Sequence, residues 1–190
     1  MVHARLPERP KGADCKSAGS AFVGSNPSSG TAPNGKTTTR WLLPDAGGGH
    51  RVLLCLADEV SEGKNGSTSE ADASTGSSRD AEFDGIILPG GTGNADQLRM
   101  DEAAVEIVKK HVEAGKPLAV ICHGAWILTD ADVLRGRTLT SYPSLKTDLQ
   151  NAGAKWVDEE VHVDNGLVSS RTPADLDAFN AKLVEEFAEG

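Results

Sequence analysis

Apolar runs alternate with amphipathic stretches from Glu82 to the end of the chain. Phe83–Leu88 and Leu118–Ile121 are short and continuously apolar, which is the pattern of strands buried on both faces of a parallel sheet. Between them, residues 101–114 carry apolar side chains at helical spacing, start with acidic residues and stop at Gly115. Strands that alternate with helices predict a parallel sheet covered on both faces.

The rest of this half continues the alternation. Further helices are predicted at 126–134 and 144–152, and further strands at 137–141, 156–163 and 167–170. Asn165-Gly166 between the last two strands is a strong signal for a two-residue hairpin turn. A final helix is predicted after Pro173, with one apolar stripe made by Leu176, Phe179, Leu183 and Phe187.

The first eighty residues have a different character. Residues 1–34 show no helical or strand period and are punctuated by turn formers, as expected of a disordered tail. Val52–Leu56 is a predicted buried strand, and 59–80 returns to loop composition.

A second explanation for the N-terminal segment comes from its possible codons. Asp14–Ser17 can be encoded by DNA that carries a GTA anticodon, and Gly24–Pro27 by DNA that contains a TTCGAAT-like transfer-RNA loop. Their order and spacing resemble a bacterial tyrosine transfer RNA gene read as protein. We therefore interpret residues 1–44 as a disordered or non-native extension and residues 45–190 as an α/β domain.

Composition narrows the function classes. The 190 residues are 38% apolar and carry a formal charge of −9, which argues against a nucleic-acid or anionic-membrane partner. Cys15, Cys55 and Cys122 are too widely spaced for a disulfide framework or a zinc pattern. No apolar stretch could span a bilayer and no secretory h-region is present, so we expect a cytoplasmic protein with neither metal nor cofactor.

The candidate chemistry lies at Cys122, directly after the predicted strand 118–121 and before a helix. Helix amides beneath such a turn favour the thiolate and can stabilise a developing oxyanion. The expected donors are the backbone N–H groups of His123 and Gly91, because the two strand ends should lie side by side. The competing interpretation is an inert core cysteine.

Two other side chains could serve this thiol. His123 could act as a base or a hydrogen-bond donor, or simply be a polar residue at a helix start. Asp96 follows Gly90-Gly91 in a predicted loop and could orient a histidine across a subunit interface; otherwise it is a solvated carboxylate. We interpret His162, in a predicted hairpin strand, as structural.

These residues also carry a family resemblance. The strings FDGIILPGG, AVICHGAWIL and GRTLTSYPSLKTDLQNAGAKWVDEEV resemble the PfpI branch of the ThiJ/PfpI superfamily, and the match runs from Glu82 to Gly190 and more weakly from Asp45. The resemblance implies a flavodoxin-like three-layer sandwich with a parallel sheet, related to class I glutamine amidotransferases and assembled into homo-oligomers. It also implies Cys122 as nucleophile, His123 as its neighbour in a triad, and Asp96 as an acid supplied by another subunit.

The chain departs from the family pattern at its start. Family members open with a central strand, followed by a loop that brings a glutamate beside the cysteine, and nothing before Asp45 matches this strand. The sheet is then left with an unpaired flank unless another segment fills the gap. Glu59 or Glu62 could replace the missing acid, although no spacing supports either one.

Three functions remain open after the sequence alone. The first is a cysteine-dependent glyoxalase or protein deglycase that acts on methylglyoxal or its adducts, so that its partners are a small aldehyde or a glycated protein. The second is an intracellular cysteine peptidase of the PfpI type, and the third is a truncated, non-catalytic relative or oxidation sensor. A glutamine amidotransferase is disfavoured, because His162-Val163-Asp164 is the only late approximation to the His-x-Glu pair of that chemistry.

Overall fold

A seven-stranded sheet in the order β3-β1-β2-β4-β5-β9-β8 organises the computed structural model, which describes residues 37–42, 51–56 and 73–189. Its strands are β1 (Thr37–Leu42), β2 (Arg51–Leu56), β3 (Ala73–Ser74), β4 (Gly85–Leu88), β5 (Leu118–Ile121), β8 (Val161–Asp164) and β9 (Leu167–Ser170). β2, β4, β5 and β9 pair in parallel, whereas β1, β3 and β8 pair antiparallel towards the two edges. The predicted parallel sheet is therefore confirmed at the centre of the fold.

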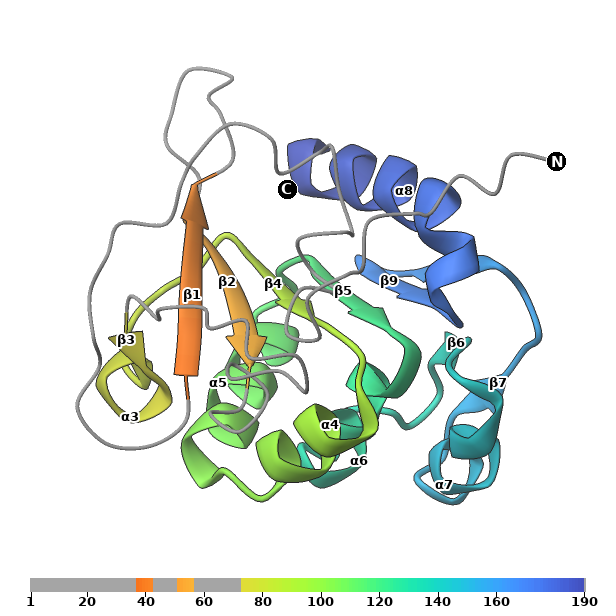
Figure 1. The fold of residues 1–190 in the computed structure, drawn as a ribbon, viewed down its shortest axis with the longest axis horizontal. Coiled ribbons are helices and arrows are strands. Elements are labelled where there is room, and N and C mark those ends of the chain that lie inside the picture. The colour runs from red at the N-terminus through yellow and green to blue at the C-terminus, as the bar shows by residue number, and fades with distance from the viewer. Residues whose placement is uncertain (1–36, 43–50, 57–72, 190) are drawn as a thin grey trace, which may run out of the picture.

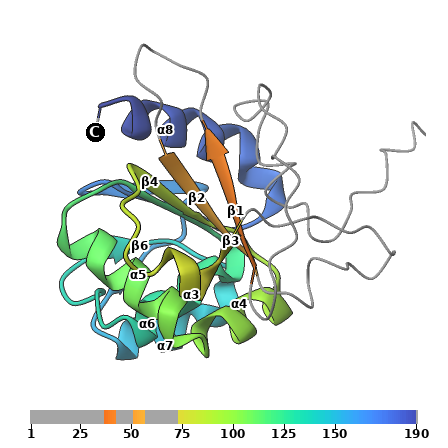
Figure 2. The same cartoon turned by 90° about the vertical axis from the view of Figure 1, so that its left-hand side faces the viewer.

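Helices cover the sheet on both faces. They are α3 (Thr75–Ser78), α4 (Thr92–Arg99), α5 (Glu102–Glu113), α6 (Ile127–Asp130), α7 (Lys146–Asn151) and α8 (Leu176–Glu189). Figures 1 and 2 show α8 on one side of the sheet, with α3, α4, α5 and α6 on the other.

The alternation of side chains along the strands produces two cores. Ile86 and Leu88 on β4 belong to the cluster that packs with α5 and α6, whereas Ile87 between them belongs to the cluster that packs with α8. Every side chain of β4 and β5 is buried, as the continuous apolar runs predicted. The three-layer α/β sandwich is confirmed, and the carboxyl ends of the parallel strands are where a ligand site is expected.

The flank of the sheet beside β4, where the sequence predicts a missing strand, is occupied by β2. β2 pairs with β4 in parallel, with Val52 opposite Gly85 and Leu54 opposite Ile87, and β1 continues the sheet beyond β2. β1 lies before residue 45, so the sheet includes residues that we had assigned to the N-terminal extension. The interpretation of residues 1–36 falls outside the described part of the chain.

In the C-terminal third, one predicted strand is wrong and the predicted hairpin turn is confirmed. The single strand predicted at 156–163 is wrong: Lys155–Trp156 forms β7, which pairs in parallel with β6 (Thr138–Leu139) in a separate two-stranded sheet, while β8 joins the main sheet. The acidic run 158–160 separates β7 from β8, and all three of its residues are exposed to solvent. The hairpin turn is confirmed, with Asn165 and Gly166 at φ values of 49° and 76°.

Candidate functional site

Cys122 lies at the turn where β5 ends. It opens a short 3-10 helix, Cys122–Trp126, which leads into α6, and its φ of 61° places it in the left-handed region that non-glycine residues rarely occupy. Such strain is typical of residues that a fold holds in place for a function. The half-buried thiol therefore sits on a sharp strand-to-helix turn with the geometry of a nucleophile elbow.

Two glycines allow this turn to pack against the end of β4. A Cβ on Gly90 would lie 2.6 Å from the Cβ of Cys122 and 3.2 Å from its Sγ. A Cβ on Gly124 would meet the carbonyl oxygens of Leu88 and Pro89, the latter at 2.7 Å. The glycines of the two motifs are thus explained by close approach of the two turns, which only a residue without a Cβ permits.

His123 contacts the thiol through one ring nitrogen and a serine through the other. Its Nδ1 lies 3.2 Å from Sγ of Cys122, and its Nε2 lies 3.2 Å from Oγ of Ser144. The ring stacks on Tyr142, with centroids 4.6 Å apart and planes 26° from parallel. Burial lowers the pKa of His123 below its ordinary value, so the imidazole is neutral at neutral pH and can accept a proton.

The segment that supplies Tyr142 and Ser144 is bonded to the elbow through its main chain and to β7 through a side chain. The amide of Tyr142 donates to the carbonyl of Cys122 at 3.2 Å, and Nε1 of Trp156 donates to Oγ of Ser141 at 3.0 Å. Sequence reasoning missed both Tyr142 and Ser144. The available signal was their place directly after the predicted strand 137–141, at an edge where functional loops gather.

Gly91 lies on the other side of the thiol, after β4. Leu88 on β4 is opposite Val120 on β5, which confirms that the two strand ends lie side by side. Gly91 has a φ of 94° and is the N-cap of α4, and the preceding turn is held by the buried Asn94, whose Nδ2 donates to the carbonyls of Pro89 and Gly90 at 3.3 Å. The first N–H groups of a helix have no acceptor within it, and Gly91 stands at that end of α4.

Asp96 does not join the site within one chain. It lies in α4 rather than in the loop that we predicted, and its side chain is exposed. Among the described residues, no hydrogen bond or ion pair links it to His123. The helix was missed because its sequence, TGNADQLR, buries only Asn94, Ala95 and Leu98.

Other candidate acids and histidines lie elsewhere. Glu59 and Glu62 fall outside the described residues. Nδ1 of His162, on β8, lies 2.8 Å from Oε2 of Glu159, and its structural role stays a prediction. The part of the chain that the structure describes holds no cluster of three or more His, Cys, Asp or Glu residues placed to bind a metal. Nor does it hold a helix of the length and apolarity that crossing a bilayer requires.

A separate cavity of about 440 Å³ opens at the opposite end of the strands, between residues 79–83 and α5. Its charged groups are already paired: Nζ of Lys110 lies 2.8 Å from Glu106, and Nζ of Lys116 lies 4.0 Å from Glu82. The buried His111 in its wall contacts the carbonyl of Pro117 through Nε2 at 2.8 Å. The cavity therefore offers no free reactive group comparable to the thiol at the elbow.

The fold and this site define a flavodoxin-like α/β protein with a cysteine at a strand-to-helix elbow. The DJ-1/PfpI family model matches residues 37–186. A deglycase of Pyrococcus abyssi is 48% identical over 138 residues, which covers 72% of this chain and 82% of that protein. The chain therefore belongs to the DJ-1/PfpI family.

One further curated relative and one solved structure are also similar to this chain. YraA of Bacillus subtilis, named as a candidate cysteine protease, is 43% identical over 122 residues, covering 64% of this chain and 72% of that protein. The crystal structure of Drosophila melanogaster DJ-1beta matches with a TM-score of 0.61 at 30% identity, covering 66% of this chain and 68% of that one. Family membership thus includes relatives named as deglycases and as a protease.

Proposed function

We propose that this protein is a cysteine-dependent deglycase or glyoxalase that acts on methylglyoxal or its adducts. The observation that carries the proposal is the 3.2 Å contact between Sγ of Cys122 and Nδ1 of a neutral His123, at a turn that faces the ends of the strands. A positioned base beside a thiol is the arrangement that generates a nucleophilic thiolate.

The proposed reaction needs no external oxidant or reductant. The Cys122 thiolate adds to the aldehyde carbon, and the carbonyl oxygen takes the proton that His123 received from the thiol, which forms a hemithioacetal. The proton on that carbon then moves to the neighbouring ketone carbon through an enediol, while the hemithioacetal hydroxyl loses its proton and the ketone oxygen gains one, which gives a lactoyl thioester. Water then hydrolyses the thioester, releases lactate and restores the thiol, so that methylglyoxal plus water equals lactic acid.

Two backbone groups and one acid complete the proposal. The N–H groups of Gly91 and His123 are proposed to stabilise the oxyanion that forms when the thiolate adds. The family resemblance assigns an orienting carboxylate to Asp96 of a second copy, which requires a homo-oligomer. An exposed Asp96 on α4 is compatible with reaching a neighbouring subunit.

The test is the loss of methylglyoxal with formation of lactate by the purified full chain. We expect turnover in the original protein and in Thr147→Ala, an exposed change on the adjacent α7, and only the uncatalysed rate in Cys122→Ser and His123→Gln. Circular dichroism of each variant separates lost chemistry from lost folding. A folded original protein with no turnover would reject the proposal and favour a non-catalytic role such as oxidation sensing.

A peptidase is the second candidate, supported by the name of the Bacillus subtilis relative. The same thiolate would form an acyl-cysteine with a peptide carbonyl and release an amine that takes the thiol proton, and water would then hydrolyse the acyl-cysteine to a carboxylic acid and restore the thiol. Release of peptides from casein that disappears in Cys122→Ser, measured across fractions of defined oligomeric state, would favour this reaction. Turnover of methylglyoxal without casein cleavage in any fraction would exclude it.

A further inference from the structure

Both ring nitrogens of His123 are engaged within a single chain. Nδ1 faces Sγ of Cys122 and Nε2 faces Oγ of Ser144, each at 3.2 Å. A neutral imidazole carries one proton, and the partner of each nitrogen decides which of them holds it. When Nε2 carries the proton and donates it to Ser144, Nδ1 is left as a bare acceptor that faces the thiol.

We propose that Ser144 is a positioning residue that selects this tautomer of His123 and so controls how readily Cys122 loses its proton. The proton moves from Sγ to Nδ1, while the Nε2 proton stays on the ring and in its bond to Ser144. A carboxylate performs the corresponding task in the Ser-His-Asp arrangement, where it holds the histidine in the reactive tautomer. A hydroxyl oxygen is a weaker acceptor than a carboxylate, but it continues to accept from Nε2 when Nδ1 gains the thiol proton, because the Nε2 proton stays on the ring.

The surroundings hold Ser144 in place without using its hydroxyl. The amide of Tyr142 donates to the carbonyl of Cys122, and Leu145 is buried in the core at 2% exposure. The 3-10 turn Pro143–Leu145 has no side-chain capping bond. Removing the Ser144 hydroxyl should therefore change the environment of His123 and leave the turn intact.

Ser144 thus contacts Nε2 within a single chain, so an Asp96 carboxylate from a second copy would have to displace it to orient the ring. This inference rests on the proposed function for its consequence on turnover, but its consequence on thiol reactivity can be measured independently. The readout is the rate at which iodoacetamide alkylates Cys122 between pH 5 and 9, followed on the Cys122 peptide by mass spectrometry so that Cys15 and Cys55 do not contribute.

Variants with and without a hydroxyl at residue 144 separate the effect of the hydroxyl from the effect of side-chain shape. We expect iodoacetamide to alkylate Cys122 about fivefold more slowly at pH 7 in Ser144→Ala and Ser144→Val than in the original protein. This is the effect of losing one hydrogen bond of about 1 kcal/mol. Their alkylation profiles should shift to higher pH. Ser144→Thr, which has the shape of valine but keeps the hydroxyl, should restore the original rate, and Thr147→Ala should match the original protein throughout.

Wild-type rates in both the alanine and the valine variants would overturn the inference, as would a threonine variant as slow as valine. Methylglyoxal turnover of the original protein is measured beside these rates. The expected alkylation pattern without turnover would reject the proposed function and leave the role of Ser144 standing. Turnover with alkylation that is indifferent to Ser144 would reject the role of Ser144 alone.

Discussion

Replacement of Gly124 by alanine tests whether the elbow depends on close contact between two backbone turns. The added Cβ would lie 2.7 Å from the carbonyl oxygen of Pro89, 2.9 Å from the carbonyl carbon of Leu88 and closer still to its oxygen. All three are backbone atoms at the end of a central strand. They cannot rotate away as the far end of a side chain can.

The expected cost is about 3 kcal/mol, at the upper end of the range for overpacked cores, because relief requires β4 and the elbow to separate. That would be a large part of the roughly 5–15 kcal/mol by which a domain is stable. Gly93 provides the matched control: a Cβ there meets nothing within 4 Å, and the residue lies in the first turn of α4. Alanine at Gly93 should therefore stabilise by about 0.5–1 kcal/mol through its higher helix propensity.

Urea unfolding followed by circular dichroism measures both changes. With a slope of about 2 kcal/mol per molar urea, the Gly124→Ala midpoint should fall by about 1.5 M, while the Gly93→Ala midpoint rises slightly. Equal midpoints for the Gly124→Ala variant and the original protein would refute the argument. It would mean that the two turns are not in the contact described.

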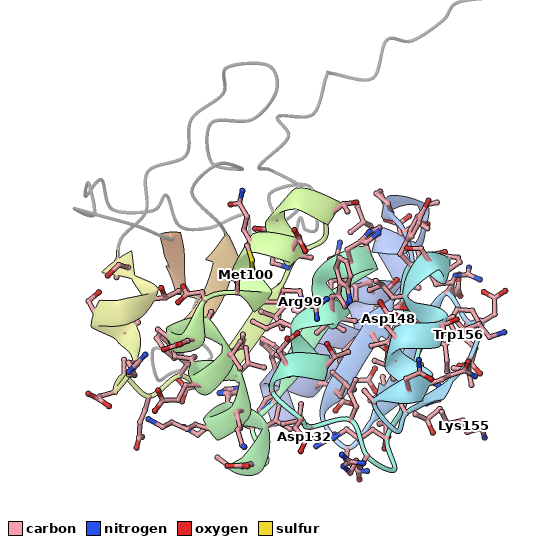
Figure 3. The ribbon with its side chains drawn as sticks, turned by 90° about the horizontal axis from the view of Figure 1, so that it is seen from below. Arg99, Met100, Asp132, Asp148, Lys155 and Trp156 are labelled. Atoms are coloured by element: carbon pink, nitrogen blue, oxygen red, sulfur yellow. The ribbon has the colours of Figure 1, made fainter. Side chains whose placement is uncertain are left out.

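Two further predictions concern pH and the outer face of the helical layer. Burial lowers the pKa of His111 below 6.5, so the unfolded chain binds more protons than the folded one and stability should fall as the pH drops through and below 6.5. The variant His111→Gln keeps a donor for the carbonyl of Pro117. Its unfolding free energy should depend less steeply on pH than that of the original protein. The guanidinium of Arg99, on the face seen in Figure 3, lies 4.5 Å over the Trp126 ring, and its Nε lies 2.9 Å from Asp130. Arg99→Ala should therefore lower the free energy of unfolding in urea by about 1 kcal/mol. The control Arg135→Ala, at an exposed residue, should lower it by less than about 0.5 kcal/mol. Equal slopes for His111→Gln and the original protein, or equal costs for the two arginines, would contradict these assignments.

The sequence was informative wherever burial alone determines structure. The runs that became β4 and β5 are apolar throughout because both faces are covered, and the Asn165-Gly166 turn follows from the positive φ that its two positions require. α4 was missed because its polar sequence offers few apolar positions at helical spacing. The start of this helix is held by the side chain of Asn94, whose bonds to the carbonyls of Pro89 and Gly90 are local in sequence but leave no trace in a hydrophobic period.

The candidate site divides in the same way. Cys122 and its neighbouring glycines could be identified because an elbow is a local feature of one strand and one turn. Tyr142 and Ser144 lie about twenty residues further along, and their contacts with His123 depend on how a loop folds back over β5. Periodicity indicates that such a loop reaches the strand ends, but not which of its side chains meets the ring.

The start of the chain is where the relatives supply both a strand of the sheet and a carboxylic acid, and these two contributions can be replaced to different degrees. A strand beside β4 is required mainly for backbone hydrogen bonds, so β2 can fill that place through its pairing of Val52 with Gly85 and of Leu54 with Ile87. A carboxylic acid beside the thiol is a single side chain at a single point, and pairing of another strand does not replace it. Where that acid is missing, His123 is the group that takes the Cys122 proton, and Ser144 holds its ring in place.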